Sequence, residues 1–142
     1  MNYFLISLRY ENYKQLCESN FSEIGLPEHS RLVETIVPGD RIVLYVGKPK
    51  SGIPGIIEAT SSMFISRTML WDEFFPKRIT AKPFLMLSDE EFVSMRNAKN
   101  GLSFVRPELK KFGVYFMQGI RKLSEADYNY LYEKVKNYGN ES

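Results

Sequence analysis

The sequence predicts an α+β fold, in which one small curled sheet of about five to six strands is flanked by short helices. Apolar and alternating segments of strand length recur along the chain, and turn residues separate them. Segments with helical periodicity are short and stand apart from the strands. This mixture favours a sheet rolled into a small barrel. The length of 142 residues fits one domain, residues 1–142.

Two strands are predicted in the first third of the chain. Tyr3–Leu8 is almost wholly apolar, so we expect both of its faces to be buried. Arg41–Val46 is rich in β-branched and aromatic residues, as strands are. It follows the turn Pro38-Gly39-Asp40, in which proline presets φ and glycine accepts a positive φ.

Three later segments alternate with a period of two. Ile53–Ser66 is predicted as one long, bent or bulged strand, with Glu58 facing solvent or an ion pair. Lys77–Leu87 contains Pro83, which lacks an N–H and therefore places the strand at an edge or at a bulge. Phe112–Ile120 carries glycines on one face, which leaves room for a close neighbour.

Four short helical segments are predicted around these strands. The first two are Glu11–Glu18 and Glu28–Thr35. The last two begin after Ser88 and Ser124, each of which is followed three residues later by an acid. A serine and an acid at this spacing are typical of a capped helix N-terminus. The Ser19–Pro27 segment and the connection 67–76 are predicted to be irregular.

Composition limits the possible functions. The net charge is +2 and the pI about 8.6, which permits nucleic-acid binding without demanding it. One cysteine, Cys17, excludes an internal disulfide and a cysteine-based zinc cage, and the single histidine, His29, makes a poor metal site. No apolar run approaches the ~20 residues that span a bilayer, and the N-terminus lacks a signal peptide's basic region. We therefore predict a cytoplasmic protein without metal, cofactor or membrane contact.

The chemistry that remains is aromatic and basic. The sequence has no Ser-His-Asp, Cys-His or HExxH grouping and no glycine-rich phosphate loop. Cations beside aromatic rings suit a nucleic acid, because the cations meet phosphates and the rings stack on bases. The alternative is that the lysines form solvated faces and the rings fill the core. The basic residues in question are Lys48 and Lys50, Lys77, Arg78 and Lys82 near Trp71, and Arg106, Lys110 and Lys111 before Phe112.

Five segments in a fixed order carry a resemblance that covers nearly the whole chain. They are Tyr3-Phe4-Leu5-Ile6, Gly25 to His29, Pro38-Gly39-Asp40 with the strand behind it, Pro54-Gly55-Ile56-Ile57-Glu58, and Leu123-Ser124 to Tyr132. In these segments the chain resembles the EVE domain family of the PUA-like superfamily, which also holds the YTH domains. It looks closest to the compact single-domain archaeal members.

The resemblance implies a PUA-like small β-barrel with a non-catalytic pocket for a modified base, flipped out of DNA or presented on RNA. Flipping costs a few kcal/mol, which stacking worth about 1–3 kcal/mol per base helps to offset. The family often has tryptophan where this chain has Phe4 and Ile24. The pocket residues that the resemblance implies are Phe4, Ser7, Ile24, Gly25, His29 and Tyr45, with Trp71 and Phe112. The implied phosphate contacts are Lys48, Lys50, Lys77 and Arg78.

Three functions are therefore compared. The main hypothesis is a nucleic-acid-binding module that accommodates a modified base. The alternative is a small-molecule or nucleotide binder without a polymer partner, whose affinity would barely change with salt. The third is an RNA-processing enzyme, whose turnover would be lost on replacing a buried carboxylate or lysine.

Overall fold

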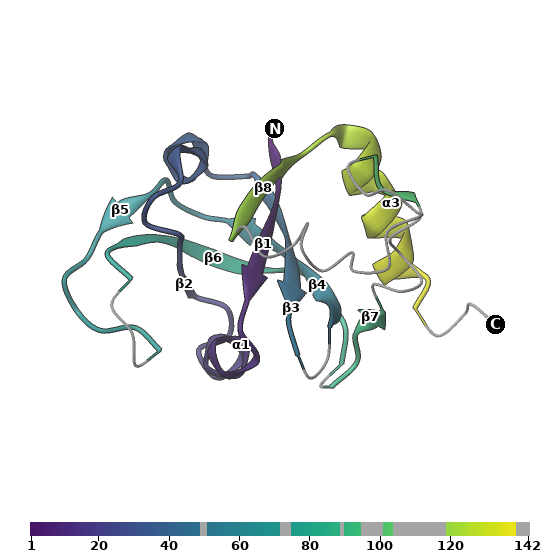
Figure 1. The fold of residues 1–142 in the computed structure, drawn as a ribbon, viewed down its shortest axis with the longest axis horizontal. Coiled ribbons are helices and arrows are strands. Elements are labelled where there is room, and N and C mark those ends of the chain that lie inside the picture. Colours follow the sequence, from purple (N-terminus) through teal and green to yellow (C-terminus); the bar gives the residue numbers. More distant parts are fainter. Residues whose placement is uncertain (49–50, 72–74, 89, 95–100, 104–118, 139–142) are drawn as a thin grey trace.

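The computed structural model is a curled mixed sheet with helices at its sides, an α+β fold as the sequence predicts (Figure 1). The structure describes residues 1–48, 51–71, 75–88, 90–94, 101–103 and 119–138. In chain order its elements are β1 (Tyr3–Leu8), α1 (Tyr10–Glu18), β2 (Glu23–Gly25), the 3-10 helix η1 (Arg31–Thr35), β3 (Arg41–Val46), β4 (Gly52–Ala59), β5 (Phe64–Ile65), β6 (Lys77–Met86), β7 (Val93–Ser94), β8 (Ile120–Leu123) and α3 (Glu125–Lys136).

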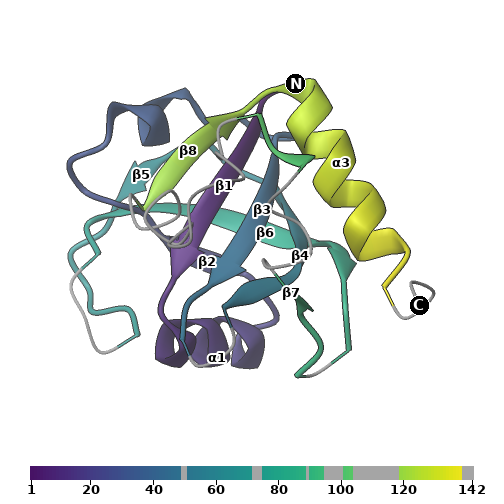
Figure 2. The same ribbon diagram turned by 45° about the vertical axis from the view of Figure 1, so that its right-hand side comes forward.

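The main path through the sheet runs β2-β6-β4-β3-β1-β8. Strands β1 and β3 pair in parallel, with Tyr3 opposite Arg41. The other neighbours on the path are antiparallel, and the short strands β5 and β7 pair with β6 and β4. Figure 2 shows α3 lying along the part of the sheet formed by β1, β3 and β4, with α1 near the end of β1.

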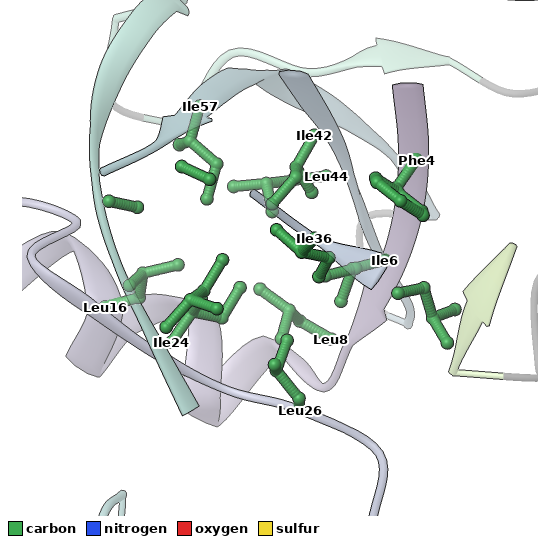
Figure 3. Close-up of a cluster of buried hydrophobic side chains, with 14 of the residues drawn as sticks. Phe4, Ile6, Leu8, Leu16, Ile24, Leu26, Ile36, Ile42, Leu44 and Ile57 are labelled. Atoms are coloured by element: carbon green, nitrogen blue, oxygen red, sulfur yellow. The ribbon is translucent and has the colours of Figure 1, made fainter. Parts of the chain in front are cut away.

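Alternation along the strands gives the sheet two buried faces. Inside the curl, side chains from β1, β3, β4, α1 and the segment around β2 point toward one another (Figure 3). We call this cluster the inner core; it includes Phe4, Ile6, Leu16, Ile24, Ile42, Leu44 and Ile57. The outer core, between the sheet and α3, includes Leu5, Val43, Tyr45, Ile56, Leu131 and Val135. Burying each such side chain contributes about 1.5–3 kcal/mol.

Several elements match their predicted form. Strands β1 and β3 have the predicted bounds, and α3 begins after Ser124, whose Oγ accepts a hydrogen bond from the Asp127 amide at 3.1 Å. Glu58 forms the predicted ion pair, with Arg41 at 2.9 Å. Pro83 lies at a bulge: Ile56 of β4 pairs with Leu85 but Ile57 pairs with Pro83, so Phe84 is the extra residue of β6.

Three predictions were wrong. Ile53–Ser66 is two strands rather than one, since the Ser61 hydroxyl takes the Thr80 N–H at 2.9 Å in place of a ladder bond. The Ser19–Pro27 segment contains β2, which pairs with β6. No helix begins after Ser88 among the described residues, because Val93 pairs with Ile53 of β4 and forms β7.

One predicted strand falls largely outside the described residues. In Phe112–Ile120 only residues 119 and 120 are described, and Ile120 begins β8. In the part of the chain that is described, no helix is both long enough and apolar enough to cross a membrane.

Candidate functional site

A cleft of about 390 Å³ lies between the end of α1, the start of β2 and the connection that leads to β6. Small-molecule sites typically occupy about 300–1,000 Å³, so the cleft is large enough for one flat ring system. We call it the Trp71 cleft. One wall is formed by Gln15, Glu18, Ser19, Ser22 and Glu23, and the other by Met69, Leu70 and Trp71.

The first wall depends on how α1 ends. Asn20 adopts a left-handed conformation with φ of 56°, which asparagine tolerates better than most residues. The amide of Phe21 donates to the Leu16 carbonyl at 2.9 Å, and that of Asn20 donates to Cys17 at 3.0 Å. This is the hydrogen-bond pattern of a Schellman cap. The cap turns the chain sharply, so that Ser22 and Glu23 face the cleft beside the end of the helix.

The second wall is built around Trp71, the only tryptophan in the chain. Its side chain is only 6% exposed and packs edge-on against Phe75, with ring centroids 5.4 Å apart. Its φ of 57° is rare for a bulky residue, and Phe21 on the opposite side has a φ of 60°. Such conformations cost about 1–3 kcal/mol each and gather at functional sites. Trp71 lines the cleft, and Phe21 directly precedes Ser22 of the opposite wall.

Gly25 allows the second wall to pack against β2. A Cβ atom at this position would lie 2.6 Å from the Phe75 ring, closer than side chains approach one another. The absence of a side chain therefore lets Phe75 approach the strand, and Phe75 in turn supports Trp71. Two residues of the predicted pocket, Gly25 and Trp71, are thus brought together through Phe75.

Arg78 connects the two walls of the cleft through its hydrogen bonds. This role differs from the phosphate contact that was predicted for it. It is 3% exposed, and its guanidinium donates to the Phe75 carbonyl at 2.7 Å and to Glu23 at 3.1 Å. It also donates to both the hydroxyl and the carbonyl oxygen of Thr68. Because its donors are used inside the protein, Arg78 positions the connection that carries Trp71.

The polar groups of the cleft are mostly acceptors. Glu18 and Glu23 contribute carboxylates, and Gln15 an amide. The Ser19 hydroxyl donates to the Leu16 carbonyl at 2.9 Å, which leaves its oxygen lone pairs as acceptors. An indole ring, the thioether of Met69 and several acceptors can hold a flat ligand that bears amino groups. Arg78 offsets the charge of Glu23, but the Glu18 carboxylate repels phosphate, so a phosphate group would have to remain outside the cleft.

The other residues of the predicted pocket do not converge on this cleft. Phe4 and Ile24 are completely buried in the inner core and expose no surface to a ligand here. Ser7 and Tyr45 are paired across β1 and β3, and Tyr45 belongs to the outer core. His29 is exposed in the turn before η1, and Phe112 lies outside the described residues.

Phe4 and Tyr45 lie on opposite faces of the sheet, since alternate positions of one strand point in opposite directions. Burial also raises the pKa of Tyr45 above its ordinary 10.0, against a smaller lowering by a hydrogen bond with Ser51. A buried hydroxyl of this kind belongs to the packing of the outer core.

The remaining predicted phosphate contacts are scattered. Lys48 is exposed just after β3. Lys77 begins β6 and lies 3.7 Å from a Glu34 carboxylate oxygen. Lys50 lies outside the described residues.

Sequence reasoning missed most of the cleft: Gln15, Glu18, Ser19, Ser22, Glu23, Met69 and Leu70. These polar and apolar residues have no distinctive spacing, and about fifty positions separate the two walls in the sequence. The only local signal is Asn20, whose tolerance of a left-handed conformation can end a helix.

No family model matches the chain. A curated relative, the UPF0310 protein PH1033 of Pyrococcus horikoshii, is 27% identical over 95% of this chain and 99% of its own length. Solved structures share the architecture at lower identity. Human THYN1, in complex with DNA containing 5-methylcytosine, has a TM-score of 0.62, with 9% identity over 96% of this chain and 98% of its own.

The YTH domain of Zygosaccharomyces rouxii MRB1, in complex with N6-methyladenosine RNA, has a TM-score of 0.64. It is 12% identical over 94% of this chain and 86% of its own. The chain has the PUA-like fold. In this chain, the cleft lies beside β2 and β6, at one end of the curled sheet.

Proposed function

We propose that this chain is a non-catalytic nucleic-acid-binding module that accommodates a modified or flipped base in the Trp71 cleft. One observation carries the proposal: two structures of the same fold, THYN1 and the YTH domain, hold a methylated DNA and a methylated RNA. The cleft adds chemical support, since it combines an indole ring with hydrogen-bond acceptors.

In this proposal Trp71 packs against the base, and Glu18 or Glu23 accepts a hydrogen bond from an exocyclic amino group. Stacking on an aromatic ring contributes about 1–3 kcal/mol per base, and flipping a base costs a few kcal/mol. The sugar and phosphates stay outside the acidic cleft. Lys77 and Lys48 are the proposed phosphate contacts.

The proposal is tested with labelled oligonucleotides of about twelve nucleotides, single- and double-stranded, unmodified or carrying one methylated base. Binding is followed by fluorescence anisotropy and by the emission of Trp71, which a stacked base quenches. We expect tighter binding to a methylated strand, and loss of that preference in Trp71→Leu. No binding of any oligonucleotide above background at low salt would contradict the proposal.

A matched pair of variants tests the carboxylate contact. Glu18→Gln should weaken binding of the preferred base, because a charged acceptor forms a stronger hydrogen bond than a neutral one. Glu11→Gln is the control, since Glu11 is exposed on the same helix but does not line the cleft. Equal effects of the two variants would assign the change to net charge instead.

One observation favours a second candidate, a binder of free nucleobases or nucleosides. Among the described residues, those that line the Trp71 cleft include two carboxylates and no lysine or arginine. This candidate predicts that adenosine or cytidine quenches Trp71 with an affinity that hardly changes between about 50 and 200 mM salt, whereas polymer binding falls steeply. The enzyme hypothesis predicts turnover of a bound RNA, seen as shortened or altered products on a gel.

A further inference from the structure

Four aromatic rings form a connected row on the other side of the molecule, across β1, α3 and β6. Tyr3 stacks on Tyr128 with centroids 4.2 Å apart, Tyr128 lies 6.2 Å from Tyr132, and Tyr132 lies 6.3 Å from Phe84. We call this row the ring ladder. Tyr128 and Tyr132 are four residues apart and therefore share one face of α3.

The ladder is most buried at Tyr128 and becomes more exposed from there toward Phe84. Tyr128 is 6% exposed, Tyr132 is partly buried, and Phe84 is 40% exposed. Phe84 is the extra residue of the β6 bulge, which accounts for a large aromatic side chain at the surface. An exposed aromatic residue that leads into a packed row of rings offers a firm surface for a flat group.

Arg41 fixes the geometry of this surface. Its guanidinium lies 3.4 Å from the centroid of the Phe84 ring, its Nε is 2.9 Å from Glu58, and its Nη1 donates to the Tyr128 hydroxyl at 3.4 Å. Three partners from β4, β6 and α3 therefore hold one cation. A cation over a ring and an ion pair together restrain Phe84, so little ordering is needed when a ligand stacks on it.

The charge around the ladder is positive. Lys82 is 61% exposed and lies 3.3 Å from Glu58, which also pairs with Arg41. Lys136 is exposed one turn beyond Tyr132, with its Nζ 5.9 Å from that ring. Arg41 and Lys82 thus share one carboxylate, and Lys136 adds a third cation beside Tyr132. Such a surface attracts phosphates, in contrast to the acidic Trp71 cleft.

We propose that the ring ladder binds a single nucleic-acid strand, with bases stacking on Phe84 and Tyr132 and phosphates contacting Lys82 and Lys136. This inference rests on the proposed function and extends it, because the strand is the continuation of the one whose base occupies the Trp71 cleft. Arg78 beside the cleft and Phe84 are six residues apart on β6, a span of about 20 Å. A stacked strand advances about 3.4 Å per nucleotide, so at least about six nucleotides separate the two surfaces.

The test is a length series of unmodified and methylated single strands, from about four to twelve nucleotides. Phe84→Ala should weaken binding of the longest strands about tenfold, the effect of losing one stacked base, and should leave the shortest methylated strand unchanged. Phe84→Leu keeps an apolar side chain but removes the ring, and should weaken long strands similarly. Ile65→Ala is the control, since Ile65 is 61% exposed and belongs to β5, on the opposite side of the molecule from α3 (Figure 1).

The charged residues are tested separately. The double variant Lys82→Ala and Lys136→Ala should lower the slope of log affinity against log salt by about 1 to 2 for long single strands. Lys122→Ala is the control, since Lys122 is exposed on β8, where it pairs opposite Phe4 of β1.

The outcomes separate the two proposals. If the wild type binds no oligonucleotide, the proposed function fails. If it binds but Phe84→Ala and Phe84→Leu match it at every length, the ladder inference is wrong and the proposed function stands. Equal weakening of short and long strands also contradicts the inference. Self-association of the wild type that Phe84→Ala abolishes, with unchanged affinity for long strands, would assign the surface to a second copy of the chain instead.

Discussion

The two ends of β6 each place an arginine beside an aromatic side chain, but they use the arginine differently. At the start of the strand, Arg78 is buried and its donors bind Glu23, Thr68 and the Phe75 carbonyl. Toward the other end, Arg41 of β3 lies over the partly exposed Phe84. Figure 1 shows β5 and α3 on opposite sides of the molecule, with β6 running between them.

The difference teaches how one strand can support two sites of opposite charge. Trp71 is 6% exposed and faces a cleft with two carboxylates, whereas Phe84 is 40% exposed among cations. Arg78 therefore contributes shape to the cleft, and Arg41 contributes rigidity and charge to the ladder. Removing each arginine should distinguish these roles.

The largest effect is expected for Arg78→Met. Breaking a buried charged network costs about 3 kcal/mol, although the half-exposed Glu23 can recover some hydration. The free energy of unfolding is measured in urea with Trp71 fluorescence as the probe. Arg31→Met, at an exposed position of η1, should change stability by no more than about 0.5 kcal/mol. A loss in Arg78→Met no greater than in Arg31→Met would show that Arg78 does not hold the cleft.

A smaller effect is expected for Arg41→Met. The cation over Phe84 and the partly exposed ion pair with Glu58 together contribute about 1 kcal/mol, and Lys82 remains to neutralise Glu58. Trp71 emission of the native state should be unchanged in this variant and shifted in Arg78→Met. If both variants shift Trp71 emission equally, the two ends of β6 are not independent.

The smallest effect concerns alkaline pH at the ladder end. Burial raises the pKa of Tyr128 above its ordinary 10.0, and the hydrogen bond and charge of Arg41 lower it to a lesser extent. Because the pKa of Tyr128 is higher in the folded than in the unfolded state, its contribution to stability is complete at pH values below the unfolded-state pKa. The contribution is lost as the pH rises through the folded-state pKa. Tyr128→Phe should therefore flatten the fall of unfolding free energy above pH 10. The same slope in wild type and variant would assign the alkaline loss to other groups.

Local chemistry made β1, β3 and α3 predictable. Runs of apolar and β-branched residues, the Pro38-Gly39 turn and the Ser124 cap act within a few residues of one another, and each formed as expected. Ser88 carries the same capping signal but lies next to a segment that pairs with β4. There, long-range pairing outweighed a local helix signal.

The cleft could not be predicted in the same way. Gln15 and Met69 meet only because Arg78 and the packing of Phe75 on Gly25 fold the connection back onto β2. The family resemblance implied Phe4 and Ile24 as pocket residues, but strand alternation directs both into the inner core. The resemblance also implied Trp71, which lines the cleft, and Gly25, which packs against Phe75, but it gave no sign of their polar neighbours.

The bulge at Phe84 also changes which side of the sheet β6 serves. Before it, the odd-numbered Ile79 and Ala81 point into the inner core; after it, the even-numbered Met86 packs there and the odd-numbered Leu85 packs against the outer core. One extra residue therefore reverses the parity of the strand. Deleting it would exchange Leu85 and Met86 between two differently shaped interiors. A single-residue insertion thus couples the two cores, and its loss would disturb the packing of both.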